Sequence, residues 1–152
     1  MRSIGTMACY ALVIAFALLV MPTGALAQTF TIVDVPGAEA AGINPQGDIV
    51  GFYVTGTENR GFLLDKEGTL TTIYVPGASV TRARGISPQG DIVGFYGDAG
   101  GATHGFLRDK KGTFTTIDVP GASFTEAIGV NPRGDIVGRY SAGGTFHGFL
   151  AQ

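Results

Sequence analysis

The stretch GINPQGDIVGFY (Gly42–Tyr53) returns as GISPQGDIVGFY (Gly85–Tyr96) and again as GVNPRGDIVGRY (Gly129–Tyr140). The copies are 43 and 44 residues apart along the chain. A period of this length is typical of a supersecondary unit that buries its apolar surface only against its own copies. The sequence therefore predicts three stacked repeats.

Segments on either side of this stretch repeat with the same period and have the composition of β-strands. They are dense in Thr, Ile, Val, Phe and Tyr, no segment keeps a helical period, and turn residues recur about every ten residues. Asn44-Pro45-Gln46-Gly47 is typical of a type I turn followed by a bulge, and each Val-Pro-Gly-Ala is typical of a type II turn with Gly at positive φ. We therefore predict an all-β fold of three four-stranded antiparallel repeats of about 43 residues. The flanking repeats are FTIVDVPGA (Phe30–Ala38), LTTIYVPGA (Leu70–Ala78) and FTTIDVPGA (Phe114–Ala122), and RGFLLDKEGT (Arg60–Thr69), HGFLRDKKGT (His104–Thr113) and HGFLAQ (His147–Gln152).

The order of the strands predicts closure by strand exchange. The segment Thr29–Val35 has the sequence of a unit's last strand but comes first, while the third unit has a third strand at Phe146–Ala151 and no fourth. Pairing of these two segments would remove two sheet edges. We expect propeller-like units, with a β-trefoil-like threefold body as the alternative. Closed propellers usually have four or more units. Two further alternatives are therefore an open arc of three units and a homodimer that forms a six-unit ring.

The N-terminal residues 1–27 are predicted to be a signal peptide. Arg2 precedes the apolar run Met7–Met21, and Ala25-Leu26-Ala27 places small residues where a signal peptidase reads the chain. The run is short for a membrane span, so we expect no span after cleavage. The prediction is an exported protein, periplasmic or extracellular, with one domain over residues 28–152. The one cysteine, Cys9, lies in the discarded part.

Charge and composition exclude several functions. The net charge is −2 and no basic patch is present, which excludes nucleic acid as an expected partner. No unit gathers a nucleophile, a base and a carboxylate at related positions, so we predict that the protein is not an enzyme. Asp48, Asp91 and Asp135 recur and invite a calcium interpretation, but we expect them to bind their own turns. No metal and no cofactor is predicted.

The tripeptide Arg133-Gly134-Asp135 resembles an adhesion motif. Arg133 occupies the turn position that Gln46 and Gln89 fill in the other two units. Gly134 serves the turn, and Asp135 begins a strand. The motif is therefore predicted to be a turn that carries one substitution.

Positions that differ between the units are the better candidates for a binding site, because shared positions serve the fold three times. Arg82 and Arg84 are two residues apart, which places both on one face of a strand. Arg139 replaces the phenylalanine of the other two units. Such arginines suit a carboxylate or an acidic sugar, although pairing with Glu126 or Glu39 of neighbouring units is the simpler prediction. The candidate binding residues are Arg82, Arg84, Glu126, Arg139, His104 and His147.

The composite of GINPQGDIVGFY, HGFL and FTTIDVPGA resembles the HAF family of extracellular repeats. Gly105 and Gly148 stand where the motif that names the family has Ala, and Arg60 replaces its His in the first unit. The resemblance implies an exported, β-rich, propeller-like repeat without catalytic residues. We expect a secreted, non-catalytic binding module for a glycan or for an envelope or extracellular protein. The alternatives are a structural or assembly protein that acts as an oligomer and, third, a carboxylate-based hydrolase.

Overall fold

Eleven β-strands make up the part of the chain that the computed structural model describes, residues 28–152. The predicted signal peptide, residues 1–27, lies outside the described residues. All eleven strands belong to one compact unit, Val35–Gln152. They are β1 (Ala38–Ile43), β2 (Ile49–Thr55), β3 (Glu58–Leu64), β4 (Leu70–Ile73), β5 (Val80–Ile86), β6 (Ile92–Gly97), β7 (Thr103–Arg108), β8 (Phe114–Ile117), β9 (Phe124–Val130), β10 (Ile136–Ala142) and β11 (Thr145–Ala151).

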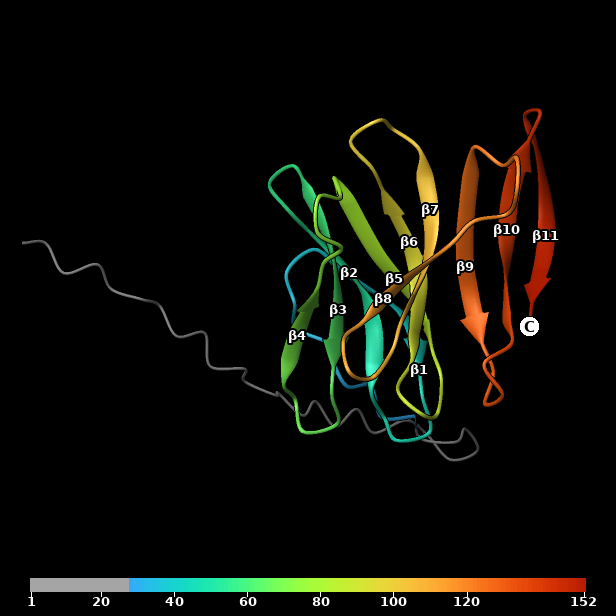
Figure 1. The fold of residues 1–152 in the computed structure, drawn as a ribbon. Coiled ribbons are helices and arrows are strands. Elements are labelled where there is room, and N and C mark those ends of the chain that lie inside the picture. Colours follow the sequence, from blue (N-terminus) through green and yellow to red (C-terminus); the bar gives the residue numbers. More distant parts are fainter. Residues whose placement is uncertain (1–27) are drawn as a thin grey trace, which may run out of the picture. The chain divides into compact units, whose positions relative to one another are not determined.

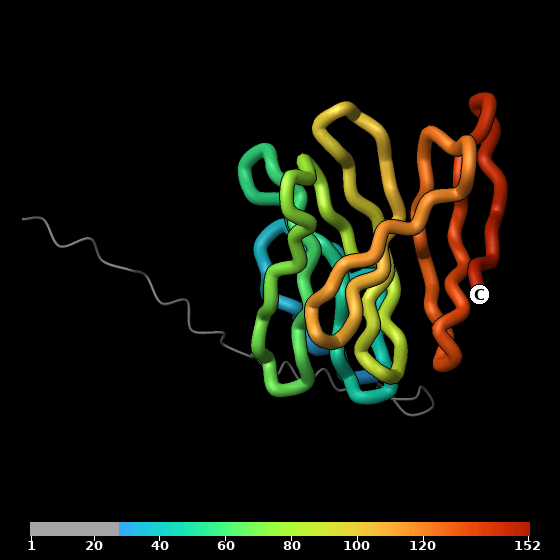
Figure 2. The backbone as a smooth tube through the Cα atoms, viewed as in Figure 1, coloured from blue at the N-terminus to red at the C-terminus, as the bar shows by residue number. Residues whose placement is uncertain are grey.

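The strands pair into three antiparallel meanders, which we number as units I to III. Unit I is the antiparallel meander β1–β4, unit II is β5–β8, and unit III is β9–β11. Units I and II each have four strands, whereas unit III has three. The units follow one another from cyan to red in Figure 1, and Figure 2 shows the chain crossing from β8 to β9 in orange. Single parallel bridges, Asn59 with Val80 and Thr103 with Phe124, join consecutive units.

Together the eleven strands form one curled, all-β sheet. Within a unit every strand pairs with the strand before it. The first strands of neighbouring units lie against one another, β1 against β5 and β5 against β9, and we call these three the inner strands. No helix among residues 28–152 is long and apolar enough to cross a membrane.

Closure by strand exchange is not seen. The structure assigns no strand between Gln28 and Gly37, and β11 pairs with β10 alone in the part of the chain described. Phe30 is 77% exposed and Ile32 is 73% exposed. A segment of this length does not hold a strand conformation unless a partner edge covers its side chains and accepts its hydrogen bonds, because ordering the backbone costs about 1–2 kcal/mol per residue.

The predicted turns are confirmed. Gly47 has a φ of 93°, and its N–H donates to the Asn44 carbonyl at 3.0 Å. Gly37 has a φ of 71°, and the Ala38 N–H donates to the Val35 carbonyl at 3.0 Å, as a type II turn requires. Equivalent bonds close the same turns in units II and III.

The core fills the space between the units. Val50 and Ile73 of unit I pack with Ala83, Ile92 and Phe106 of unit II, and all five are buried. A second cluster joins Val93 of unit II to Ala127 and Ile136 of unit III. Each unit therefore buries its apolar face against its neighbour, which is the reason the sequence repeats.

Candidate functional site

The first strand of each unit carries a β-bulge at the same place. The register of β1 against β2 shifts between Ala40 and Gly42, and that of β5 against β6 shifts between Ala83 and Gly85. In β9 the partners change from Ala127 to Gly129. The extra residues are Ala41, Arg84 and Ile128. A bulge bends the strand and re-aims one side chain, so three equivalent residues leave the regular ladder.

Glycines at equivalent positions of the second strands leave room for the backbone of the bulged strands. A Cβ added at Gly51 would collide with the carbonyl oxygen of Glu39, and one added at Gly138 would collide with that of Glu126. Glycines inside strands, here Gly51, Gly94 and Gly138, predict close backbone approach or a bulge, and both are found beside them.

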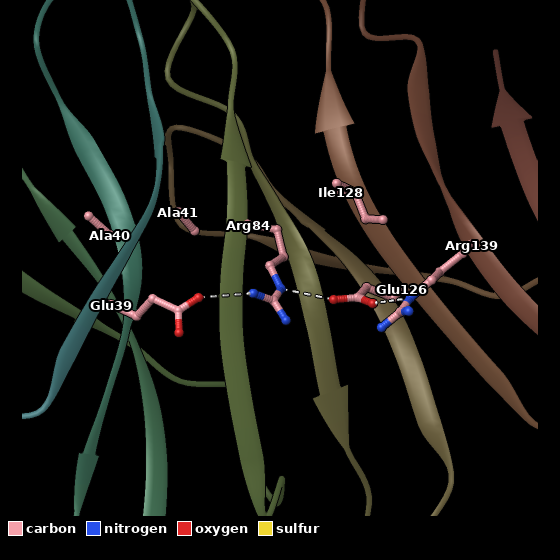
Figure 3. Close-up of a pocket in the computed structure, with 7 residues that line it drawn as sticks. All are labelled: Glu39, Ala40, Ala41, Arg84, Glu126, Ile128 and Arg139. Atoms are coloured by element: carbon pink, nitrogen blue, oxygen red, sulfur yellow. Dashed lines mark hydrogen bonds and ion pairs between the residues drawn. The ribbon is translucent and has the colours of Figure 1, made fainter.

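The bulge residues line a cavity of about 450 Å³ on the inner strands of unit Val35–Gln152. The first strands lie close together there: a Cβ on Gly42 would lie 2.9 Å from the Arg84 carbonyl oxygen, and one on Gly85 would lie 2.6 Å from that of Ile128. Figure 3 shows the site with unit I on the left and unit III on the right. The lining residues are Glu39, Ala40, Ala41, Arg84, Glu126, Ile128 and Arg139.

Four charged side chains cross the cavity in a row. The Glu126 carboxylate accepts from Arg84 Nε at 2.8 Å through Oε1 and from Arg139 Nε at 2.7 Å through Oε2. Its side chain is only 3% exposed. Arg84 Nη1 lies 3.7 Å from Glu39 Oε1. Figure 3 shows this line from Glu39 through Arg84 and Glu126 to Arg139.

Pairing of Arg84 with both neighbouring units confirms the simpler of the two predictions for that residue. Each arginine donates to Glu126 through Nε. Arg84 Nη1 faces Glu39, whereas the terminal nitrogens of Arg139 remain for other acceptors. The Arg139 side chain is 50% exposed and donates to Glu126 alone among residues 28–152. The row therefore offers guanidinium donors that are held in place by a buried carboxylate.

Arg82 does not line the cavity and pairs with neither Glu39 nor Glu126 in the described residues, so the geometry supports neither of its two predicted roles, ligand binding and pairing with a glutamate. Its guanidinium carbon lies 4.2 Å from the centre of the Phe52 ring, and Nη2 donates to Asn59 Oδ1 at 2.9 Å. Arg84 also lies near the Phe52 ring, at 5.7 Å, which confirms that the two arginines share a face. Only Arg84 reaches the cavity, because it is the bulge residue.

The two histidines lie elsewhere in the fold. His104 stacks on Tyr96 with centroids 5.1 Å apart, and its Nδ1 lies 2.9 Å from Asp118 Oδ2. Nε2 lies 3.3 Å from Asp98 Oδ2. The hydrogen bond to Asp118 raises the pKa of His104, and the bond to Asp98 adds to the effect. His147 stacks on Tyr140 at 5.3 Å.

The equivalent residue of unit I is Arg60, which lies over the Tyr74 ring at 4.0 Å. In units I and II the side chain at this position therefore contacts an aromatic ring or a carboxylate directly after the fourth strand, Tyr74 after β4 and Asp118 after β8. Within residues 28–152 no three His, Cys, Asp or Glu side chains are grouped so as to hold a metal ion.

The Arg133-Gly134-Asp135 motif is a turn, as predicted. Arg133 Nη2 lies 2.6 Å from Asp135 Oδ2, which also accepts from Asn131 Nδ2 at 2.7 Å. The bond from Asn131, and then that from Arg133, lowers the pKa of Asp135. An aspartate engaged inside its own turn is poorly placed to bind a receptor.

One detail of the turn prediction was wrong. The carboxylate of Asp48 was expected to accept backbone N–H groups of its own turn. Instead Asn44 Oδ1 accepts from the N–H of Gln46 at 3.1 Å and from that of Asp48 at 2.9 Å. Asp48 accepts from the Asn44 side chain and, at 3.2 Å, from the Lys66 N–H of the next hairpin turn. The first residue of the turn makes an Asx turn and so competes for these donors.

Comparison with solved structures shows the fold. The chain is similar to TolB from Acinetobacter baumannii, with a TM-score of 0.66 and 16% identity over 83% of this chain and 33% of the TolB chain. It is also similar to a streptogramin B lyase, with a TM-score of 0.46 and 22% identity over 77% of this chain and 42% of that one. No family model matches the chain, and no curated protein is significantly similar to it.

The likeness to TolB agrees with a β-propeller-like arrangement of the three units. The chain spans about a third of the TolB chain's length. At this identity the likeness describes the fold alone.

Proposed function

We propose that this protein is an exported, non-catalytic binding module, and that the cavity on its inner strands takes a carboxylate group of its ligand. The proposal rests on the two hydrogen bonds that Arg84 and Arg139 donate to the buried Glu126 carboxylate. A buried carboxylate fixes Arg84 and Arg139 at 2.8 and 2.7 Å through Nε alone. Arg84 Nη1 faces Glu39, whereas the terminal nitrogens of the oriented and half-exposed Arg139 are free to form charge-assisted hydrogen bonds with an anion.

The walls of the cavity favour an acidic sugar as the ligand. Ala40, Ala41 and Ile128 give it an apolar floor beside the arginines. A sugar ring offers an apolar C–H face together with polar groups at its edge, and a uronic acid adds the carboxylate. A volume of about 450 Å³ is in the range of sites that hold small ligands. A glycan that carries uronic acids therefore fits this surface better than a neutral one.

Export and membership of the HAF family are parts of the same proposal. The apolar run before residue 28 and the small residues Ala25 and Ala27 support cleavage before Gln28. The propeller-like units agree with what the HAF resemblance implies for the fold. The intact mass of the protein recovered outside the cytoplasm gives the cleavage position directly.

The test is binding of tri-galacturonate, with its fully methyl-esterified form as the uncharged control. We expect binding of the acid and at least tenfold weaker binding of the ester, measured by titration calorimetry. Arg139→Phe introduces the residue that units I and II have at this position and leaves Arg84 as the partner of Glu126, so the melting temperature of the variant is measured beside its affinity. This change should weaken binding about tenfold, since a charge-assisted hydrogen bond contributes about 1.5–3 kcal/mol.

The matched control is Arg133→Gln. It removes the same charge from an exposed turn and introduces the residue found in the other two units. Equal affinities for the acid and the ester, or equal losses in the two variants, would contradict a carboxylate site formed by Arg139.

A second candidate function, assembly into an oligomer, is favoured by the open side of unit III. Leu150 is 59% exposed and Phe146 is 57% exposed, and the outer edge of β11 has no strand beside it in the described residues. Exposed apolar strand edges invite pairing with another chain. As part of this function we propose that unit III is completed by a fourth strand with the sequence of Phe30–Val35.

A further inference from the structure

Units I and II show what a fourth strand does for the strands it covers. The Tyr53 hydroxyl lies 3.0 Å from Thr72 Oγ1 of β4, and the Tyr96 hydroxyl lies 3.0 Å from Thr116 Oγ1 of β8. Phe106, which pairs with Thr116, is fully buried. The fourth strand therefore seals the outer side of its unit.

Unit III has the same acceptor surface without its cover. Tyr140 and His147 stack at 5.3 Å and 32°, nearly as Tyr96 and His104 stack at 5.1 Å and 28°. In unit II that stack is held by Asp118, which follows directly after β8. The stack of unit III is thus preformed, and it lacks a carboxylate partner among the described residues.

A segment of the chain has the sequence that this surface needs. Phe30-Thr31-Ile32-Val33-Asp34-Val35 aligns without a gap on Phe114–Val119 of β8 and the turn after it. Asp34 falls at the position of Asp118 and Val33 at that of Ile117. Ile32 falls at the position of Thr116, so the bond to the tyrosine hydroxyl is not reproduced and an apolar contact replaces it. The exposed Phe30 and Ile32 gain burial on such pairing.

The topology decides which molecule supplies the segment. β4 pairs with β3 of unit I and then leads into β5 of unit II, so a fourth strand covers the unit that precedes the next first strand. The segment Phe30–Val35 leads into β1, and hence it covers a unit that precedes unit I. Within one chain, unit III does not lie in the position of a unit that precedes unit I. Arg84 of unit II contacts Glu39 of unit I and Glu126 of unit III, so unit II lies between them.

We propose that Phe30–Val35 of one copy adds as the fourth strand beside β11 of a second copy, with Asp34 on the partner's His147. Exchange in both directions makes a twofold-symmetric pair and joins two arcs of three units into a ring of six. Both open edges are then paired, which removes the exposed apolar strands. The proposal rests on the assembly role above and not on carboxylate binding.

Cysteine cross-linking tests the partner and the register together. In unit II, Leu107 lies opposite Thr115, and the equivalent pair is Leu150 with Thr31. Opposed residues of neighbouring strands are about 4.5–5.5 Å apart between Cα atoms, which suits a disulfide. One copy carries Thr31→Cys and the other carries Leu150→Cys, each in the chain of residues 1–152 with Cys9→Ser. We expect the mixed copies to form a disulfide-linked dimer on mild oxidation.

The control pairs Leu150→Cys with Lys66→Cys, which lies on an exposed turn of unit I and should give little cross-linked product. The second-copy proposal is overturned if a chain with both Thr31→Cys and Leu150→Cys closes on itself as a monomer. It is equally overturned if the separate copies cross-link no better than the control.

The mass in solution gives an independent result. Light scattering should give twice the mass of one chain for the wild type, and the mass of one chain for Val33→Pro, because proline cannot donate a hydrogen bond to β11. The Val35–Gln152 unit of that variant keeps its eleven strands, so its circular dichroism should differ from that of the wild type by no more than the one added strand. Binding of tri-galacturonate by the monomeric variant would separate a failure of assembly from a failure of the ligand site. A wild type that stays monomeric at high concentration overturns the proposal.

Discussion

Units II and III share the repeat sequence and differ in how much of it the fold covers. Phe106 in β7 is fully buried because β8 lies beside it, whereas the equivalent Phe149 in β11 is only half-buried. The stacks Tyr96–His104 and Tyr140–His147 are alike, but only the first is held by a carboxylate. The repeat sequence thus sets the local geometry, and a neighbouring strand decides burial and charge pairing.

The largest expected effect comes from truncating the two phenylalanines. Phe106→Ala should lower the free energy of unfolding by about 3–5 kcal/mol, since it leaves a cavity in the core. Phe149→Ala should cost about half as much in dilute protein, because that ring is already partly exposed. Urea denaturation of both variants measures the difference. As the concentration rises and a second copy covers β11, the two losses of unfolding free energy should converge. Equal losses in dilute protein would show that the outer side of unit III is already covered in the single chain.

A smaller effect is expected where units I and III differ on the inner strands. Glu126 is 3% exposed and holds two arginines, whereas Glu39 is 63% exposed and lies 3.7 Å from one. Glu126→Ala should cost about 2 kcal/mol of stability, and Glu39→Ala less than about 0.5 kcal/mol. Thermal unfolding of the two variants makes the comparison. Similar melting temperatures would mean that the hydrogen bonds of Glu126 with Arg84 and Arg139 do not contribute to stability.

The smallest effect is the dependence of stability on pH in unit II. The pKa of His104 is raised by its bond to Asp118, so the protonated histidine stabilises the folded state. This contribution is complete below the pKa of histidine in the unfolded chain, about 6.5, and it is lost as the pH rises through the higher pKa of the folded state. Asp118→Asn removes the main partner and should flatten the curve above about pH 6.5. An unchanged curve of unfolding free energy against pH would show that the His104–Asp118 pair does not couple stability to protonation.

Much of the fold follows from the sequence. The repeat of Gly42–Tyr53, the Asn-Pro-Gln-Gly and Val-Pro-Gly-Ala turns and the strand composition predict the three meanders, and the glycines at positive φ are where they were expected. These features depend on neighbours in the chain, because turn chemistry and side-chain alternation are local. The pairing of Arg84 with Glu126 and Glu39 was also within reach, since the arginine interrupts a repeat whose other copies have Ala and Ile.

The sequence alone determined the repeat, the turns and the candidate arginines. Only the tertiary structure decided that bulges aim Ala41, Arg84 and Ile128 into one cavity, that Arg82 packs on Phe52 instead of facing that cavity, and that residues 28–37 hold no strand. These outcomes depend on which strand lies beside which. A bulge or a fourth strand is stable only when a neighbouring backbone accepts its hydrogen bonds and covers its apolar side chains.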